Sequence, residues 1–202
     1  MSSHRQLTVV TGPIDSGKTG WCRKLAAANP GYGGILLLKV YRRGERIGYD
    51  SLRLSTGERI PFARIGGHEP TGWHAGDRVG PFSISAAAVK AADVWLSEAA
   101  AQTAGVIVDE IGPLELGGGG LATGLRALLD SSVWQKLYVV IRRDCVEAAC
   151  DHFGITGYTM VDVGAASEET APRNPSHSES LKINGNTGSI HYASDDPPDH
   201  VS

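Results

Sequence analysis

The fold is decided by the stretch Gly12-Pro13-Ile14-Asp15-Ser16-Gly17-Lys18-Thr19. It satisfies the pattern G-x-x-x-x-G-K-[ST], in which a loop turns consecutive backbone N–H groups inward around a phosphate group. The tight positions of such a loop leave no room for a Cβ atom, and glycine occupies both of them here. The spacing predicts a phosphate-binding loop over residues 12–19, with contacts extending to Gly20.

The segments on either side of the loop support this interpretation. Residues 7–11 form a short, β-branched apolar run, which indicates a buried strand. Residues 18–28 indicate a helix, which Asn29-Pro30-Gly31 ends. A loop between a strand and a helix gains the positive potential of the helix N-terminus, so the match lies in the context that phosphate binding needs.

The rest of the chain predicts an α/β fold with an antiparallel insertion at about residues 35–84. Strands separated by hairpin-like turns are expected over residues 35–41, 47–54 and 59–65, then a long loop over 66–77 and one strand over 79–84. Further helices are expected over residues 85–102, 121–129 and 145–152, and further strands over 106–108, 137–141 and 158–163. Strands that alternate with helices around fully apolar runs predict a mostly parallel sheet with helices on both faces.

Composition and charge exclude several kinds of partner. The 202 residues carry 19 basic and 22 acidic side chains, and a net charge of −3 is too weak to indicate a nucleic-acid or membrane surface. No apolar run approaches the roughly 18 residues that a membrane span needs. The three cysteines lack paired metal-ligand spacing. We therefore expect a reduced, cytoplasmic protein with no membrane partner, and the charge identifies no protein partner.

The chain changes character near residue 163. Residues 164–202 hold six of the acids and two of the bases, are rich in Ser, Pro, Asn and Asp, and show no periodic apolar face. Such a composition cannot bury enough apolar surface to offset the entropy of ordering the chain. We expect one domain over residues 1–163 and an acidic, disordered tail over residues 164–202.

Two acids follow the apolar run at residues 106–108. Asp109 and Glu110 are expected at the carboxyl end of a parallel strand, where open α/β sheets bind their ligands. Together with the loop, they predict a site for a nucleoside triphosphate such as ATP or GTP. Lys18 would bridge the β- and γ-phosphates, the Thr19 hydroxyl and Asp109 would hold Mg²⁺, and Glu110 would polarise the attacking water.

Three further features invite functional hypotheses. Arg142 and Arg143 follow the strand at 137–141, so either could stabilise charge on the transferred phosphoryl group, although solvated arginines are common there. The loop at 66–77 carries histidines and a tryptophan that could close over a nucleotide, but a polar surface loop is the simpler interpretation. Asp15 would be repelled by a triphosphate, so we expect it to point away or to pair with a base.

The sequence resembles the P-loop nucleoside-triphosphatases of the cancer-related nucleoside-triphosphatase type over about residues 7–141. The resemblance implies a RecA-like sheet with an antiparallel extension, Mg²⁺-dependent hydrolysis of nucleoside triphosphates to diphosphate and phosphate, and little base selectivity. Five blocks in matching order carry it: Thr11-Gly12-Pro13 with Gly17-Lys18-Thr19; Gly44-Glu45-Arg46-Ile47-Gly48-Tyr49-Asp50; Phe62-Ala63-Arg64-Ile65-Gly66; Arg78-Val79-Gly80-Pro81-Phe82; and Asp109-Glu110-Ile111-Gly112-Pro113-Leu114-Glu115-Leu116.

Three departures from that family keep two other functions open. An acidic pair that the family usually carries near Leu38 and Lys39 is missing, which allows a regulatory module that binds but does not hydrolyse nucleotide. Asp15 stands where the family commonly has glycine. With this Asp the phosphate loop resembles that of RNA polynucleotide 5′-kinases, which allows a nucleotide or polynucleotide 5′-kinase-like phosphotransferase. Gly20 replaces a hydroxyl residue that would contact the α-phosphate.

Overall fold

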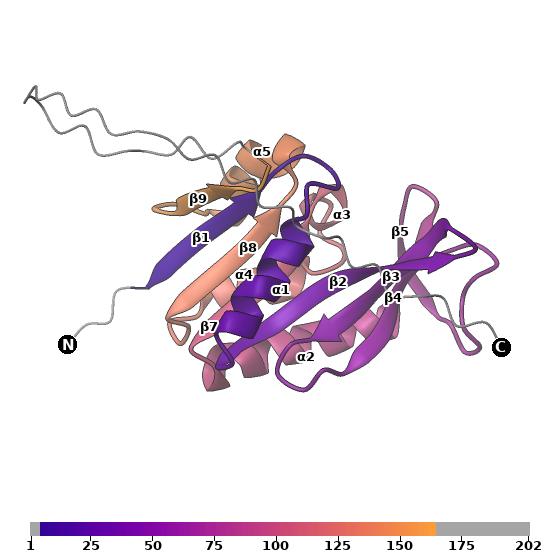
Figure 1. Ribbon diagram of the computed structural model, residues 1–202, viewed down its shortest axis with the longest axis horizontal. Coiled ribbons are helices and arrows are strands. Elements are labelled where there is room, and N and C mark those ends of the chain that lie inside the picture. The colour runs from indigo at the N-terminus through magenta and orange to yellow at the C-terminus, as the bar shows by residue number, and fades with distance from the viewer. Residues whose placement is uncertain (1–4, 165–202) are drawn as a thin grey trace, which may run out of the picture. The chain divides into compact units, whose positions relative to one another are not determined.

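A nine-stranded mixed sheet forms the centre of residues 5–164, the part of the chain that the computed structural model describes (Figure 1). The predicted tail over 164–202 lies outside the described residues except for Gly164. The strands lie in the order β5-β6-β4-β3-β2-β7-β8-β1-β9. Their bounds are β1 Gln6–Thr11, β2 Tyr32–Arg42, β3 Glu45–Arg53, β4 Arg59–Ile65, β5 Ala75–Val79, β6 Phe82–Ser85, β7 Gly105–Ile111, β8 Lys136–Ile141 and β9 Thr159–Asp162.

One half of the sheet is parallel and carries the phosphate loop. Strands β2, β7, β8, β1 and β9 are all parallel neighbours, so the carboxyl ends of β1 and β7 point to the same edge of the sheet. Strand β8 lies between β1 and β7. The strands expected at 7–11, 106–108, 137–141 and 158–163 are confirmed, each within a few residues of its predicted bounds.

The other half is antiparallel and is built by the insertion. Strand β2 belongs to both halves, because Ile35 pairs with Val108 of β7 on one side and with Arg53 of β3 on the other. Strands β3, β4, β6 and β5 follow by antiparallel pairing, so four of the eight strand pairings in the described chain are antiparallel. The sheet thus combines the expected parallel strands with the expected antiparallel insertion, and the two contribute equally to its strand pairings.

The long loop expected over residues 66–77 and the single strand expected over 79–84 are both wrong in part. Strand β5 begins at Ala75 and pairs with β6, and the two are joined by a turn at Gly80, whose φ is +54°. Four of the five residues of β5 are exposed, so its sequence carries no alternation of apolar side chains. The strand was missed because its pairing partner, and not a buried face, fixes its conformation.

Helices cover both faces of the sheet, as expected. Val9 and Val139 point to the face that α2 and α4 cover, whereas Val10 and Val140 point to the face that α1 covers. This alternation follows from the two-residue period of a strand. No helix in residues 5–164 is long and apolar enough to cross a membrane. The helices are α1 Lys18–Ala28, α2 Ala86–Gln102, α3 Pro113–Leu116, α4 Ala122–Asp130 and α5 Val146–Phe153.

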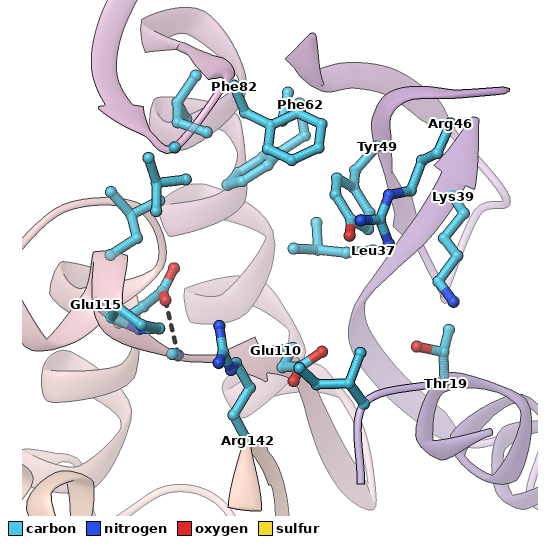
Figure 2. Close-up of a pocket in the computed structure, with 18 of the residues that line it drawn as sticks. Thr19, Leu37, Lys39, Arg46, Tyr49, Phe62, Phe82, Glu110, Glu115 and Arg142 are labelled. Atoms are coloured by element: carbon cyan, nitrogen blue, oxygen red, sulfur yellow. Dashed lines mark hydrogen bonds between the residues drawn. The ribbon is translucent and has the colours of Figure 1, made fainter. Parts of the chain in front are cut away.

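A buried carboxyl group fixes the segment that follows β7. The Glu115 side chain of α3 is 4% exposed and accepts a hydrogen bond from the backbone N–H of Gly112 at 2.9 Å (Figure 2). It accepts a second one from the backbone N–H of Leu121 at 3.3 Å. Burial raises the pKa of Glu115 to about 7, although these two N–H donors act in the opposite direction. The carboxyl group therefore links the start of α3 to the start of α4, and its burial there raises its pKa.

The raised pKa predicts a pH-dependent contribution to stability. Because the folded state binds the Glu115 proton more tightly than the unfolded state does, the stabilisation present below about pH 4.5 should be lost as the pH rises through 7. The free energy of unfolding of the wild type, relative to Glu115→Gln, should fall by up to about 3 kcal/mol across this window. Urea unfolding at several pH values measures it, with the exposed Glu147→Gln as control. A pH-independent difference would contradict the assignment.

Candidate active site

The predicted phosphate loop leaves β1 and enters α1 with the backbone that its glycines permit. Gly12 has φ +152°, and a Cβ atom there would lie 2.2 Å from the carbonyl oxygen of Val163. Gly17 precedes the helix with φ +90° in the left-handed region. Pro13 and Ile14 are exposed, and the Ser16 hydroxyl is buried with no hydrogen-bond partner among the described residues. The loop is therefore shaped by its close approach to the end of β9.

The Lys18 ammonium lies inside the loop. The side chain is 5% exposed, and Nζ donates to the carbonyl oxygens of Gly12, at 3.3 Å, and Pro13, at 3.0 Å. It also lies 3.7 Å from Oε1 of Glu110. These partners satisfy the charge without a ligand, and a phosphate group would compete with the two carbonyls for it.

The Thr19 and Asp109 side chains meet at the carboxyl edge of the parallel strands. The Thr19 hydroxyl donates to Oδ2 of Asp109 at 2.8 Å, and the backbone N–H of Leu37 approaches the same oxygen at 3.4 Å. Oδ1 of Asp109 is buried without a partner in the described chain, and burial raises the pKa of this carboxyl to about 7. A buried carboxylate with a free oxygen beside a hydroxyl is a set of hard oxygen donors that fits Mg²⁺.

Glu110 lies beside this pair and is accessible. Its side chain is 32% exposed and reaches the Lys18 ammonium. Burial raises the pKa of Glu110, while the charges of Lys18 and Arg142 oppose the increase. A carboxylate with a raised pKa is suited to accepting a proton near neutral pH.

The structure separates the two candidate arginines. Arg142 lines a cavity next to Glu110, and its guanidinium binds Asp144 through Nε, at 3.1 Å, and Nη2, at 2.6 Å. The Arg143 guanidinium instead pairs with both carboxylate oxygens of Asp162 at the end of β9. It borders neither of the two cavities at the phosphate loop. Only Arg142 is therefore brought to the other site residues.

Asp15 pairs with a base, which is one of the two arrangements expected for it. Its carboxylate accepts from Lys39 of β2 in a short hydrogen-bonded ion pair, and its φ is +62°. Lys39 lowers the pKa of Asp15, chiefly through this hydrogen bond, and the pKa of Lys39 is raised for the same reason. The pair puts one negative and one positive charge at the mouth of the phosphate loop.

Two cavities meet at the phosphate loop. The first, here called the loop cavity, is about 420 Å³ and borders Gly17, Gly20 and Arg23. The second, the aromatic cavity, is about 370 Å³ and lies between the loop, the insertion and α3 (Figure 2). The residues common to both are Asp15, Lys18, Thr19, Leu37, Lys39 and Glu110. The walls of the aromatic cavity include Arg46, Tyr49, Phe62, Phe82, Pro113, Leu114 and Arg142.

Sequence reasoning missed the residues that the insertion contributes to this cavity. Each of them lies within a sequence block that carries the family resemblance, namely Arg46, Tyr49, Phe62 and Phe82. Membership of these blocks was the available signal, but the sequence alone assigned no role to these side chains. The residues His68, Trp73 and His74 line neither cavity. Trp73 instead donates its indole N–H to Ser83 at 2.9 Å.

The ion pair at the loop mouth predicts a gain of affinity. Asp15→Asn removes a charge that repels a triphosphate and releases the Lys39 ammonium, so nucleotide should bind about twofold to fivefold more tightly at low salt. Lys39→Met should weaken binding. Equilibrium titration with a non-hydrolysable fluorescent triphosphate measures both, with the exposed Asp151→Asn as a matched control. Weaker binding by Asp15→Asn would contradict the expected repulsion.

Comparison with known proteins supports the resemblance found in the sequence. Residues 7–166 match the family described as NTPase. The nucleoside-triphosphatase THEP1 of Methanopyrus kandleri is 32% identical over 139 residues, which are 67% of this chain and 73% of that protein. The same-named protein of Archaeoglobus fulgidus is 31% identical over 110 residues, which are 53% of this chain and 61% of that protein.

Two solved structures share the fold. The crystal structure of THEP1 from Aquifex aeolicus has a TM-score of 0.61 and 17% identity, and covers 78% of this chain and 90% of that chain. The solution structure of a human cancer-related nucleoside triphosphatase has a TM-score of 0.59 and 24% identity, and covers 78% and 88%. The predicted α/β fold with its RecA-like sheet is thus confirmed. Because the match spans the loop, β7 and the whole insertion, the chain belongs to the NTPase family.

Proposed function

We propose that the chain hydrolyses nucleoside triphosphates to diphosphate and phosphate with Mg²⁺ and with broad base selectivity. The observation that carries the proposal is the Thr19–Asp109 contact beside Lys18 and Glu110. Two side chains that could bind a metal ion, and a carboxylate that could act as a base, thus lie next to one phosphate loop. The names of the two THEP1 relatives, nucleoside-triphosphatases both, support the same reaction.

The free thiols of Cys22, Cys145 and Cys150 support a reducing compartment, for which we propose the cytoplasm.

The loop binds the triphosphate through its backbone. The backbone N–H groups of the loop, in which only Pro13 lacks one, would face the phosphates, and Lys18 would exchange its two carbonyl partners for β- and γ-phosphate oxygens. The buried Ser16 hydroxyl, which has no partner among the described residues, is a further donor next to the phosphates. These contacts reach groups that all nucleoside triphosphates share, which supports broad base selectivity.

Thr19 and Asp109 are the residues that would hold Mg²⁺. Within residues 5–164 there is no cluster of three or more acidic, His or Cys side chains, so the protein would supply few ligands and the phosphates and waters the rest. When bound, the ion neutralises charge that develops on the phosphate oxygens. The free oxygen of Asp109 and its link to Thr19 orient these two donors before nucleotide arrives.

Glu110 orients the attacking water. Its carboxylate accepts a hydrogen bond from the water and takes a proton as the water oxygen bonds to the γ-phosphorus, while the bond from that phosphorus to the bridging oxygen breaks. Lys18, 3.7 Å from Glu110, keeps the carboxylate next to the γ-phosphate. The Arg142 guanidinium, held by Asp144, lines the same cavity and adds positive charge near Glu110 (Figure 2).

The mechanism predicts that Glu110→Gln separates binding from turnover. The amide keeps the shape of the side chain but cannot take a proton, so phosphate release should fall by about 10²–10⁴-fold. Binding of the triphosphate should change little. Phosphate release and nucleotide titration on the same preparation measure the two, and the exposed Glu147→Gln is the matched control.

Lys18→Ala should fail in the opposite way. Losing a charged donor to the phosphates should weaken binding by roughly tenfold to a hundredfold, whereas the exposed Lys24→Ala on the same helix should bind as the wild type does. Unchanged turnover in Glu110→Gln would remove the mechanism. Tight binding by the wild type without phosphate release would instead favour the regulatory module.

A further inference from the structure

The aromatic cavity lies at the end of the loop where the γ-phosphate is expected. Lys18, which contacts the β- and γ-phosphates in such loops, lines both cavities together with Thr19 and Glu110, whereas Gly17 and Gly20 border only the loop cavity. The nucleoside is attached at the other end of the triphosphate. Because Gly20, at the position next to the α-phosphate, borders the loop cavity and not the aromatic cavity, the aromatic cavity is on the side from which a phosphoryl acceptor would approach.

The cavity is larger than hydrolysis requires. A water molecule takes about 30 Å³ of liquid volume, whereas the aromatic cavity measures about 370 Å³. This volume lies within the range of about 300–1,000 Å³ that is typical of small-molecule sites. The cavity therefore has room for a small molecule in addition to the attacking water.

The walls of the cavity combine aromatic rings with one free cation. Tyr49 and Phe82 stack edge to face with ring centroids 5.5 Å apart, and the Arg46 guanidinium lies over both rings, at 5.5 and 5.9 Å from their centroids. Figure 2 shows Arg46 between the rings and the mouth of the phosphate loop. Arg46 forms none of the ion pairs found among the described residues, whereas Lys39 and Arg142 are paired with Asp15 and Asp144.

These groups specify the chemistry of an occupant. The aromatic rings suit a flat ring, the Arg46 guanidinium suits a phosphate group, and the Glu110 carboxylate suits a hydroxyl group. One class of molecule carries all three, namely a nucleotide with a free sugar hydroxyl. Such a nucleotide is available as a free monophosphate or at the end of an oligonucleotide.

From this arrangement we infer that the aromatic cavity is an acceptor site, in which a nucleotide hydroxyl receives the γ-phosphoryl group in place of water. The inference rests on the proposed use of the loop and of Glu110. The acceptor oxygen bonds to the γ-phosphorus, the bond from that phosphorus to the bridging oxygen breaks, and the hydroxyl proton passes to Glu110. The products are a nucleoside diphosphate and an acceptor that carries one more phosphate.

Transfer is tested by following the label of a γ-labelled triphosphate into two products in one reaction. The acceptors offered are adenosine 3′-monophosphate, adenosine 5′-monophosphate and a short 5′-hydroxyl oligoribonucleotide, with adenosine as the control that lacks the phosphate. We expect label on at least one phosphorylated acceptor and at least tenfold less on adenosine. Label on the free monophosphates or on the oligonucleotide alone identifies which source of the hydroxyl fits.

Two variants tie the transfer to the cavity. Arg46→Met removes the free cation and should lower the ratio of labelled acceptor to free phosphate at least tenfold. Arg42→Met removes an exposed arginine from the same hairpin and should leave the ratio unchanged. Phe82→Leu, on a different strand, should also lower the ratio. It tests the same cavity if Arg46→Met unfolds the hairpin.

The outcomes separate this inference from the proposed function. Equilibrium dialysis of labelled adenosine 3′-monophosphate against protein saturated with a non-hydrolysable triphosphate measures occupancy without turnover, and saturable binding that Arg46→Met weakens supports the site. Phosphate release with no label on any acceptor overturns the inference alone, whether or not an acceptor binds. Failure of both phosphate release and transfer overturns the proposed function as well.

Discussion

The hydrogen bond between Thr19 and Asp109 is the contact on which the site depends. It joins residues 90 apart in the sequence, one at the start of α1 and the other near the end of β7. The two strands that deliver them are not neighbours, because β8 lies between β1 and β7. The contact exists only when all three strands are paired in register, so the nucleotide site cannot form before the parallel half of the sheet does.

Asp15 and Lys39 are best understood together. The Asp15 carboxylate alone would repel the phosphates of a nucleotide, and the Lys39 ammonium on β2 offsets that charge. In this chain each supplies the counter-charge of the other, so the pair carries no net charge at the loop mouth. Two departures from the family that looked independent in the sequence are therefore one feature of the structure.

The sequence predicts those parts of the site that are local in the chain. Lys18 and Thr19 follow from the loop pattern, and Asp109 follows from an apolar strand that ends in acids, because parallel strands end at one edge of the sheet. The aromatic cavity could not be predicted in this way. Tyr49 and Phe82 come from strands that do not pair with each other, and their contact depends on the register of the intervening β4.

Strand β2 has a consequence for how this chain can vary. Leu36 and Leu38 pack with the core on the α1 face, whereas Leu37 and, two residues on, Lys39 face the cavity. Deleting or inserting one residue in this stretch would exchange the two sets, and the core would receive an ammonium while the cavity received a leucine. A length change of one residue within β2 would therefore disturb the core and the cavity together, whereas a length change between α1 and β2 would leave both sets of side chains in place.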